Sequence, residues 1–292
     1  MLIRKFTNPS LIIFSIIALF SLNTIQAQIG IGTTSPDASA MLEVESTEKG
    51  FLPPRMDSDA RNNINSPAEG LMIYNTDTNC LQFYDGRFWI SACDGMPDVS
   101  TVIGANGVEW MDRNLGANQV ANASNDAASY GDLYQWGRSA DGHEDRNSST
   151  ASGPVAAGSE GSNFITELVD WLSTPDDDRW NANETSGGSV VKTVNDPCPA
   201  GYRVPTEAEL DAERANWSSN NAAGAFASPL KLPMAGSRVR TNGSLSSVGT
   251  FGFYWSSTVS GTDVSSLRFN SSGASMLTFS RASGYSVRCL KD

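Results

Sequence analysis

Short runs of alternating apolar and polar residues, broken by Gly, Asn, Asp and Ser, fill most of the chain and predict short strands joined by turns. Residues 28–93 are predicted to form a small β-rich module, residues 94–98 (DGMPD) a linker, and residues 99–292 one larger domain. Two stretches of the larger domain, 139–162 and 173–195, are rich in Gly, Ser, Asn and Asp without periodicity. They predict long surface loops.

Helical patterns occur at two places in the larger domain. Thr206 followed by Glu209 makes a capping box, which predicts a helix over 207–217. A second helix is predicted over 163–172. Leu210, Arg214 and Trp217 lie on one stripe of the first helix, and Phe164, Leu168 and Leu172 lie on one face of the second. Two helices combined with many irregular strands and long loops predict an α+β domain.

The hairpin near the end of the module has two candidate registers. A type I′ turn at residues 85–86 places Cys80 opposite Ser91, whereas a type II′ turn at residues 86–87 places it opposite Cys93. The second register makes Cys80 and Cys93 a non-hydrogen-bonded pair with Cα atoms ~4.5 Å apart, within reach of a disulfide. Both registers put the same apolar side chains on one face: Leu81, Phe83, Phe88, Ile90 and Ala92. A disulfide therefore selects between registers that burial does not distinguish.

The N-terminus has the pattern of a secretory signal peptide over residues 1–27. Arg4 and Lys5 form the positive region, and the apolar run 11–22 is too short to span a bilayer of ~30 Å. Cleavage after Ala27 leaves 18 basic and 32 acidic side chains, so the net charge is 18 minus 32, or −14. Such a charge repels phosphate backbones, which argues against a nucleic-acid partner. The expected location is outside the cytoplasm, in the medium or at the outer cell surface.

Cysteine and histidine content limits the chemistry. The only histidine, His143, excludes sites that need two imidazoles. Four cysteines in an exported chain favour two disulfides, with three pairings open. A zinc site is the competing interpretation, but the sequence has no CxxC and the cysteines are spaced by 13, 105 and 91 residues.

Six sequence blocks of the larger domain then suggest a family. They are VEWMDRNLGA (108–117), YGDLYQWGR (130–138), DPCPAGYRVPT (196–206), LPMAGSR (232–238), GFYWSST (252–258) and GYSVRCLKD (284–292). In this order they resemble the Fibrobacter succinogenes major paralogous domain family, a branch of the C-type lectin-like fold that also includes formylglycine-generating enzymes. The resemblance implies an α+β, C-type lectin-like domain whose long loops present a binding surface. It also places Cys198 and Cys289 in blocks where a structural disulfide between them is expected.

The module has a resemblance of its own. IGIGTTSP (29–36), KGFLPPRM (49–56) and the hairpin at 70–93 are similar to the head segment of exported surface proteins of Bacteroidetes. IGIGTTSP also resembles segments of phage tail fibres, which are trimeric. The resemblance implies an assembly module and a homo-oligomer, with a trimer as the favoured state.

Catalysis and metal binding are each weighed against a structural role. No GxSxG surrounds Ser256 and Ser257, which argues against a serine nucleophile. A copper-dependent oxidase of the formylglycine-generating type would need two active-site cysteines, for which a disulfide is the simpler role. Asp176, Asp177, Asp178 and Glu184 offer oxygen ligands for calcium, but they match no calcium-binding motif. No cofactor is therefore predicted, and the acidic residues are assigned to a solvated loop.

The most probable function from the sequence is non-catalytic binding of an extracellular glycan or protein by an exported, adhesin-like surface protein. The predicted ligand-facing residues are Asp263, Ser265, Ser266, Arg268, Asn270 and Ser272, together with Trp180. In diversified relatives of the fold the region between the last two blocks carries the variable positions. An exposed strand without a ligand is the competing interpretation of this segment. The alternatives for the whole protein are a formylglycine-generating-like enzyme and a purely structural envelope protein.

Overall fold

The computed structural model describes residues 28–292, so the predicted signal peptide lies outside the described residues. The chain divides into two compact units, one ending at Pro54 and the other running from Arg55 to Asp292. No helix among residues 28–292 is both long and apolar enough to cross a membrane. The predicted linker at 94–98 and the domain boundary at residue 99 stay predictions.

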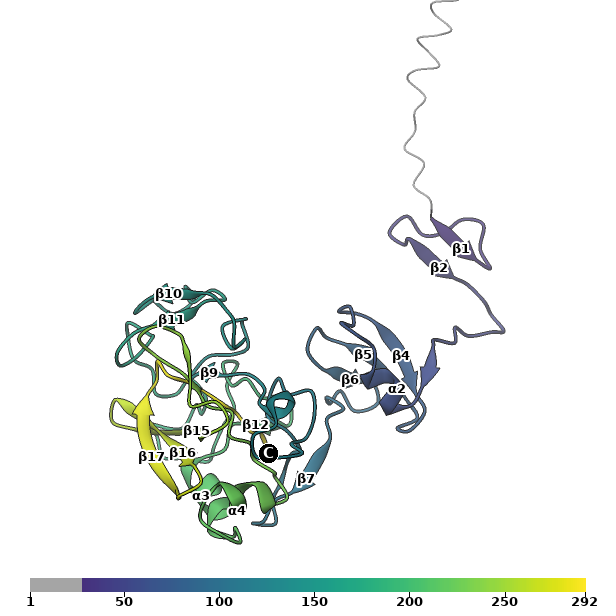
Figure 1. Ribbon diagram of the computed structural model, residues 1–292. Helices are drawn as coiled ribbons and strands as arrows, with labels where there is room; N and C mark the ends of the chain where they lie inside the picture. Colours follow the sequence, from purple (N-terminus) through teal and green to yellow (C-terminus); the bar gives the residue numbers. More distant parts are fainter. Residues whose placement is uncertain (1–27) are drawn as a thin grey trace, which may run out of the picture. The chain divides into compact units, whose positions relative to one another are not determined.

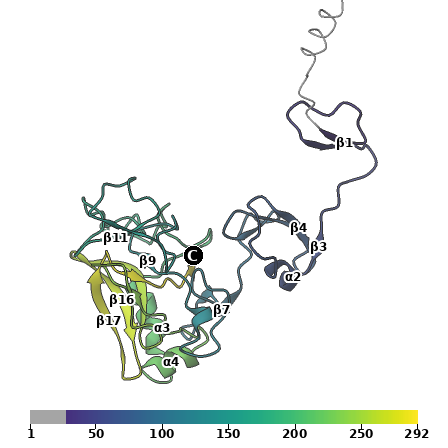
Figure 2. The ribbon, with the colours of Figure 1, turned by 45° about the horizontal axis from the view of Figure 1, so that its top comes forward.

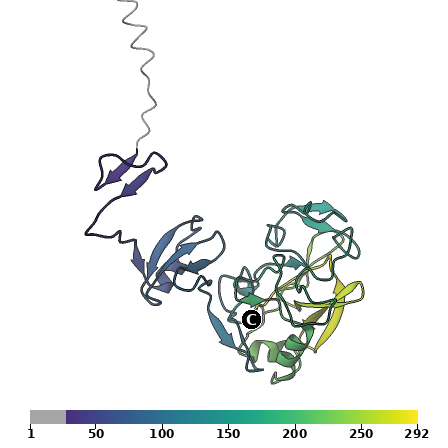
Figure 3. The same ribbon diagram turned by 180° about the vertical axis from the view of Figure 1, so that it is seen from behind.

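The N-terminal unit contains one sheet of two parallel strands, β1 (Ile29–Ile31) and β2 (Leu42–Val44), drawn in purple in Figure 3. Gly32 follows β1 with φ +85°, and a Cβ there would lie 2.0 Å from the carbonyl oxygen of Glu45. Only glycine allows this close approach of two backbone segments. The end of β1 is thereby held against the chain that leaves β2.

The second unit begins with a four-stranded sheet and one short helix (Figure 1). The strand order is β3-β4-β5-β6. The elements are β3 (Arg55–Met56), α2 (Ser58–Asn62), β4 (Met72–Asn75), β5 (Cys80–Tyr84) and β6 (Trp89–Ser91). Asp57 caps α2, since its side chain accepts a hydrogen bond from the backbone N–H of Ala60. The strand pairs β4–β5 and β5–β6 are antiparallel.

The longest strands form a three-stranded antiparallel sheet in the order β15-β16-β17. They are β15 (Gly252–Ser260), β16 (Asp263–Phe269) and β17 (Ala274–Ser280). Figure 2 shows α3 (Glu207–Ala215) beside this sheet. Val264 packs in one buried apolar cluster, whereas Leu267 and Phe269 pack in another. Because neighbouring side chains of a strand alternate in direction, the sheet is covered on both faces.

Three smaller sheets and two further helical segments surround this sheet. Their strand orders are β12-β19-β8-β7, β14-β13-β18-β9 and β10-β11. The bounds are β7 (Thr101–Ile103), β8 (Glu109–Met111), η1 (Ala127–Ser129), β9 (Tyr134–Gln135), β10 (Thr150–Ser152), β11 (Phe164–Thr166), β12 (Tyr202–Arg203), α4 (Ala222–Ala227), β13 (Ser237–Arg238), β14 (Leu245–Ser246), β18 (Gly284–Tyr285) and β19 (Leu290–Lys291). β19, at the C-terminus, pairs with both β12 and β8. The sheets are thus built from segments distant in sequence.

The predicted α+β, C-type lectin-like fold class is wrong. Only 9% of the structure is helical, and the strands lie in several small sheets, so the fold is β-rich. Many strands are only two or three residues long, and glycines with positive φ lie between them. Such frequent changes of direction leave no room for long helices.

One of the two predicted helices of the larger domain is confirmed and the other is wrong. The capping box forms as expected, because Glu209 N donates to Thr206 Oγ1 and Thr206 N donates to the Glu209 carboxylate. The segment 163–172 contains the strand β11 instead of a helix. Leu168, expected on the buried stripe, is 62% exposed. Two consecutive side chains of β11, Phe164 and Ile165, are buried in its place, a pattern that a single helical stripe does not give.

Both expected disulfides are formed. Cys80 is joined to Cys93 with Cα atoms 6.0 Å apart, and Cys198 is joined to Cys289 with Cα atoms 5.8 Å apart. The β5–β6 register pairs Tyr84 with Trp89, which agrees with a turn at residues 86–87. Two disulfides indicate that the chain folds in an oxidising compartment.

Candidate functional site

Large apolar side chains of the N-terminal unit are exposed to solvent instead of packed in a core. Ile29 in β1 is 60% exposed and its partner in β2, Leu42, is 55% exposed. The exposed large apolar side chains of residues 28–54 are Ile29, Ile31, Met41, Leu42, Val44, Phe51 and Leu52. An isolated two-stranded sheet is at best marginally stable in water. This unit therefore lacks an interior of its own and gains one only against another surface.

The two strands present these side chains as one face. In the parallel register Ile29 pairs with Leu42 and Ile31 with Val44, so all four side chains lie on the same side of the sheet. The loop that joins the strands is held by Asp37, whose carboxylate accepts hydrogen bonds from the backbone N–H and the hydroxyl of Ser39. These bonds lower the pKa of Asp37. The apolar face thus belongs to a defined local structure.

The side of the β3–β6 sheet that carries Gln82 is buried, and it combines the apolar Ile73 with polar side chains. Arg61 of α2 is 4% exposed and donates to Gln82 Oε1 at 2.6 Å. The same guanidinium forms an ion pair with Asp98, and Gln82 Nε2 also donates to this carboxylate at 2.7 Å. Asn75 Nδ2 adds a hydrogen bond to Gln82. These hydrogen bonds link this side of the sheet to α2 and to Asp98.

Three of the predicted ligand-facing residues are buried, which corrects the expectation that they face solvent. Ser265 and Ser266 are at most 2% exposed, because β16 is the central strand of a sheet covered on both faces. Trp180 is fully buried, and its indole N–H donates to the backbone oxygen of Asn195 at 2.9 Å. None of the three offers an atom to an external ligand.

The other predicted residues have local roles in the sheet. Arg268 is partly buried, with its guanidinium 4.5 Å from the ring centroid of Phe251. Asn270 accepts hydrogen bonds from Ser272 N and Gly273 N, and so shapes the β16–β17 turn. Asp263 begins β16 and is partly buried. A ligand-binding role for these positions stays a prediction.

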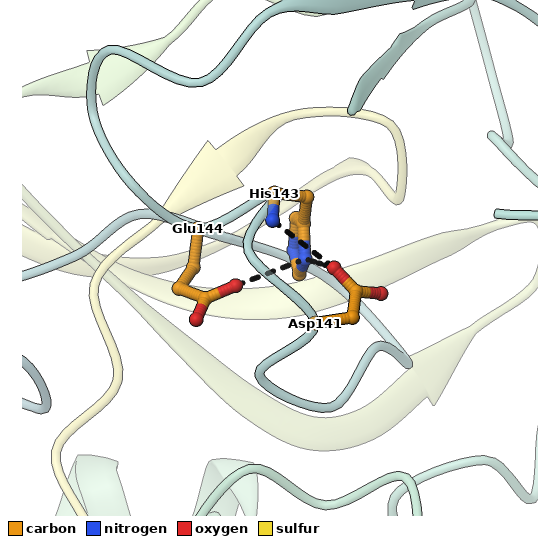
Figure 4. Close-up of side chains that lie close together, drawn as sticks. All are labelled: Asp141, His143 and Glu144. Carbon is orange, nitrogen blue, oxygen red and sulfur yellow. Dashed lines mark hydrogen bonds and ion pairs between the residues drawn. The ribbon is translucent and has the colours of Figure 1, made fainter. Parts of the chain in front are cut away.

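Asp141, His143 and Glu144 lie close together, as Figure 4 shows, and form the one group among residues 28–292 with metal-ligand geometry. His143 is fully buried, and its Nε2 accepts a hydrogen bond from Gln135 N at 3.0 Å. Nδ1 must then carry the proton of the neutral ring, which it donates to Asp141 Oδ1 at 2.6 Å. Burial lowers the pKa of His143, in agreement with a neutral ring. Because neither ring nitrogen has a free lone pair, the residues fit a structural hydrogen-bond network and not a metal site.

Asp132 lies near this network, and its acidity is altered by its surroundings. Burial and the negative charge of Glu144 raise the pKa of Asp132 to about 6. Tyr134 donates a hydrogen bond to its carboxylate at 3.5 Å, and Arg87 donates to the Tyr134 hydroxyl at 2.7 Å. A carboxylate with this pKa is partly protonated in mildly acidic solution.

A pocket of about 510 Å³ lies beside the predicted loops. Its charged lining groups pair with one another, Arg138 with Asp141 at 2.8 Å and Arg179 with Glu160 at 3.4 Å. In the acidic loop suggested for calcium, Asp177 pairs with Arg281. These carboxylates therefore already have partners within the chain.

Comparisons with known proteins assign one part of the chain. Residues 30–108 match the family described as "phage tail like trimerisation region". No curated protein and no solved structure matches the chain significantly. The match contains β1 except for Ile29, all of β2, and the β3–β6 sheet. It indicates a structural, oligomer-forming role for this segment.

Sequence reasoning assigned assembly to residues 28–93, which overlap the family match, but did not identify the exposed apolar face of β1 and β2. The signal was present in the alternation of Ile29 and Ile31 and of Leu42 and Val44, each pair separated by one residue. Such short alternation predicts a strand with one apolar face, and it does not say whether the chain itself covers that face.

Proposed function

We propose that the protein is an exported, homotrimeric structural protein whose residues 30–108 join three copies of the chain. The main support for this proposal is that the segment matching a trimerisation region also exposes an apolar face on β1 and β2. Three such faces around a threefold axis give each unit the interior that a single copy lacks. The two disulfides support export, and the signal peptide stays a prediction.

Neither binding of a glycan or protein nor an oxidase activity has support of this kind. The strand assigned to a ligand is largely buried, and Cys198 and Cys289, the two cysteines that the oxidase would need, are bonded to each other. Membership of the Fibrobacter major paralogous family stays a prediction from the six sequence blocks. A non-catalytic, structural role is therefore the function proposed here.

The trimer is tested by sedimentation velocity on the mature chain over a range of concentrations. The wild type should sediment with the mass of three chains. Ile31→Asp combined with Leu42→Asp should weaken assembly by about a hundredfold or more, because a carboxylate buried without a partner costs several kcal/mol. Val194→Asp is the matched control, since Val194 is 93% exposed and lies outside the matched segment. A wild-type monomer at all concentrations would contradict the proposal, as would an equal effect of the control.

A further inference from the structure

The β3–β6 sheet carries apolar side chains on both of its faces, which differs from a sheet with one solvated face. In such sheets apolar side chains line the covered face and polar side chains the open one. Here the covered face carries buried Ile73 beside Asn75 and Gln82, and the opposite face also carries apolar side chains, Met72 and Phe83. An apolar face without cover needs burial from outside the sheet.

The uncovered apolar surface is located by the strand register. Met72 of β4 pairs with Phe83 of β5, and Tyr74 pairs with Leu81 on the same side. Met72 is 45% and Phe83 38% exposed, although cross-strand neighbours shield part of each side chain. We call these four residues the open face. Beyond β6 the edge of the sheet is extended within the chain, because Ile90 forms a β-bridge with Pro97.

We propose that the open face is a second surface at which copies of this chain meet, distinct from the face of β1 and β2. This inference rests on the proposed trimer and names a surface within it. The matched trimerisation segment contains all four residues. A second copy, more than another partner, is the occupant that this match favours.

Charge also favours a copy of the same chain as the occupant. The chain has 32 acidic and 20 basic side chains, so two copies repel unless the contact surface lacks carboxylates. None of the strands β3 to β6 contains an acidic residue. Arg55 of β3 pairs with Tyr74 on this side, and its guanidinium lies 5.4 Å from the ring centroid of Tyr74. The four strands therefore offer no carboxylate to a basic partner, whereas they offer one cation to an acidic copy of the chain.

The test compares two double variants of the mature chain by sedimentation velocity. Met72→Asp with Phe83→Asp should raise the concentration of half-dissociation by about tenfold or more, while Val194→Asp leaves it unchanged. An unchanged dissociation in this variant, with a trimeric wild type and weakened assembly in Ile31→Asp with Leu42→Asp, would overturn the open face alone. A monomeric wild type would overturn the trimer itself.

A photo-crosslink keeps the test valid if the charged variant does not fold. Phe83 is replaced by p-benzoylphenylalanine, which retains the aromatic ring, and the irradiated protein is separated under denaturing conditions. A covalent dimer whose crosslinked peptides both lie within residues 55–108 supports the open face. Crosslinks within one chain only, or the same dimer yield from p-benzoylphenylalanine at Val194, would overturn it.

Discussion

Asp132 shows how a single side chain makes stability depend on pH. Its folded pKa of about 6 lies above the ordinary value of 3.8, so the native state binds the proton more tightly than the unfolded chain does. The stabilisation by this proton is complete below about pH 4 and is lost as the pH rises through about 6. Asp132→Asn removes the titration and should become more stable than the wild type by about 1 to 2 kcal/mol at pH 7, after allowance for solvent screening.

Urea unfolding of both proteins at several pH values measures this difference. The advantage of Asp132→Asn should be near zero at about pH 4 and grow up to about pH 7. Asp126→Asn is the control, because hydrogen bonds from Asn122 N and Gln119 lower the pKa of Asp126. That carboxylate stays ionised over most of this range, so its variant should show no comparable trend. A constant difference for Asp132→Asn would show that its carboxyl group does not titrate differently on folding.

At the same scale, the sequence identified which residues form disulfides but not which residues face solvent. Cys80 and Cys93 could be paired because hairpin register is a local property with few alternatives. The exposure of Ser265, Ser266 and Trp180 depends on which segments cover β16, and those segments come from distant parts of the chain. Small polar side chains in a central strand therefore resemble a solvated face until the topology is known.

At the scale of elements, α3 depends on its N-terminal cap. Thr206→Ala removes the hydroxyl that accepts from Glu209 N and should destabilise the protein by about 1 kcal/mol. Thr206→Ser keeps a hydroxyl and should lose much less. The midpoint of urea unfolding measures both variants, with Thr241→Ala at an exposed turn as the control. Equal midpoints for Thr206→Ala and the control would show that the cap does not contribute.

Local signals also explain which elements could be predicted. The capping box determines where α3 begins, because it satisfies backbone donors within a few residues. Over 163–172 the spacing of Phe164, Leu168 and Leu172 suits a helix, but Ile165 is also buried and β11 pairs with β10. Strand pairing with β10 prevails over the weak helical periodicity, because two consecutive side chains, Phe164 and Ile165, are buried.

At the scale of the whole molecule, the bond between Cys198 and Cys289 closes a long loop. Its separation of 91 residues corresponds to about 4.6 kcal/mol in the chain-entropy account, against about 3 kcal/mol for the separation of 13 between Cys80 and Cys93. Cys198→Ala with Cys289→Ala should therefore lower the melting temperature more than Cys80→Ala with Cys93→Ala. Differential scanning calorimetry of the two variants compares them, and the reverse order would contradict the loop-length argument.

The fold class of the whole molecule was beyond the sequence for a related reason. The six motif blocks mark the positions of β8, β9, β12, β13, β15 and β18–β19, but not how these short strands combine. In the structure β9 pairs with β18, and β19 with β8 and β12, across most of the domain. Composition and periodicity carry no information on such long-range partners.

The Cys80–Cys93 bond has a consequence for misassembly. Side chains alternate across a strand, so a slip of one residue in β5 would turn Leu81 and Phe83 toward α2 and expose Gln82 in their place. The hairpin would then be mispaired and could associate with a neighbouring chain, which is how open-ended aggregates begin. The covalent link between Cys80 and Cys93 prevents that slip, because it fixes the pairing of β5 with the chain that follows β6. The bridge thus keeps the hairpin in one register, and it makes an oxidising compartment a precondition for folding without aggregation.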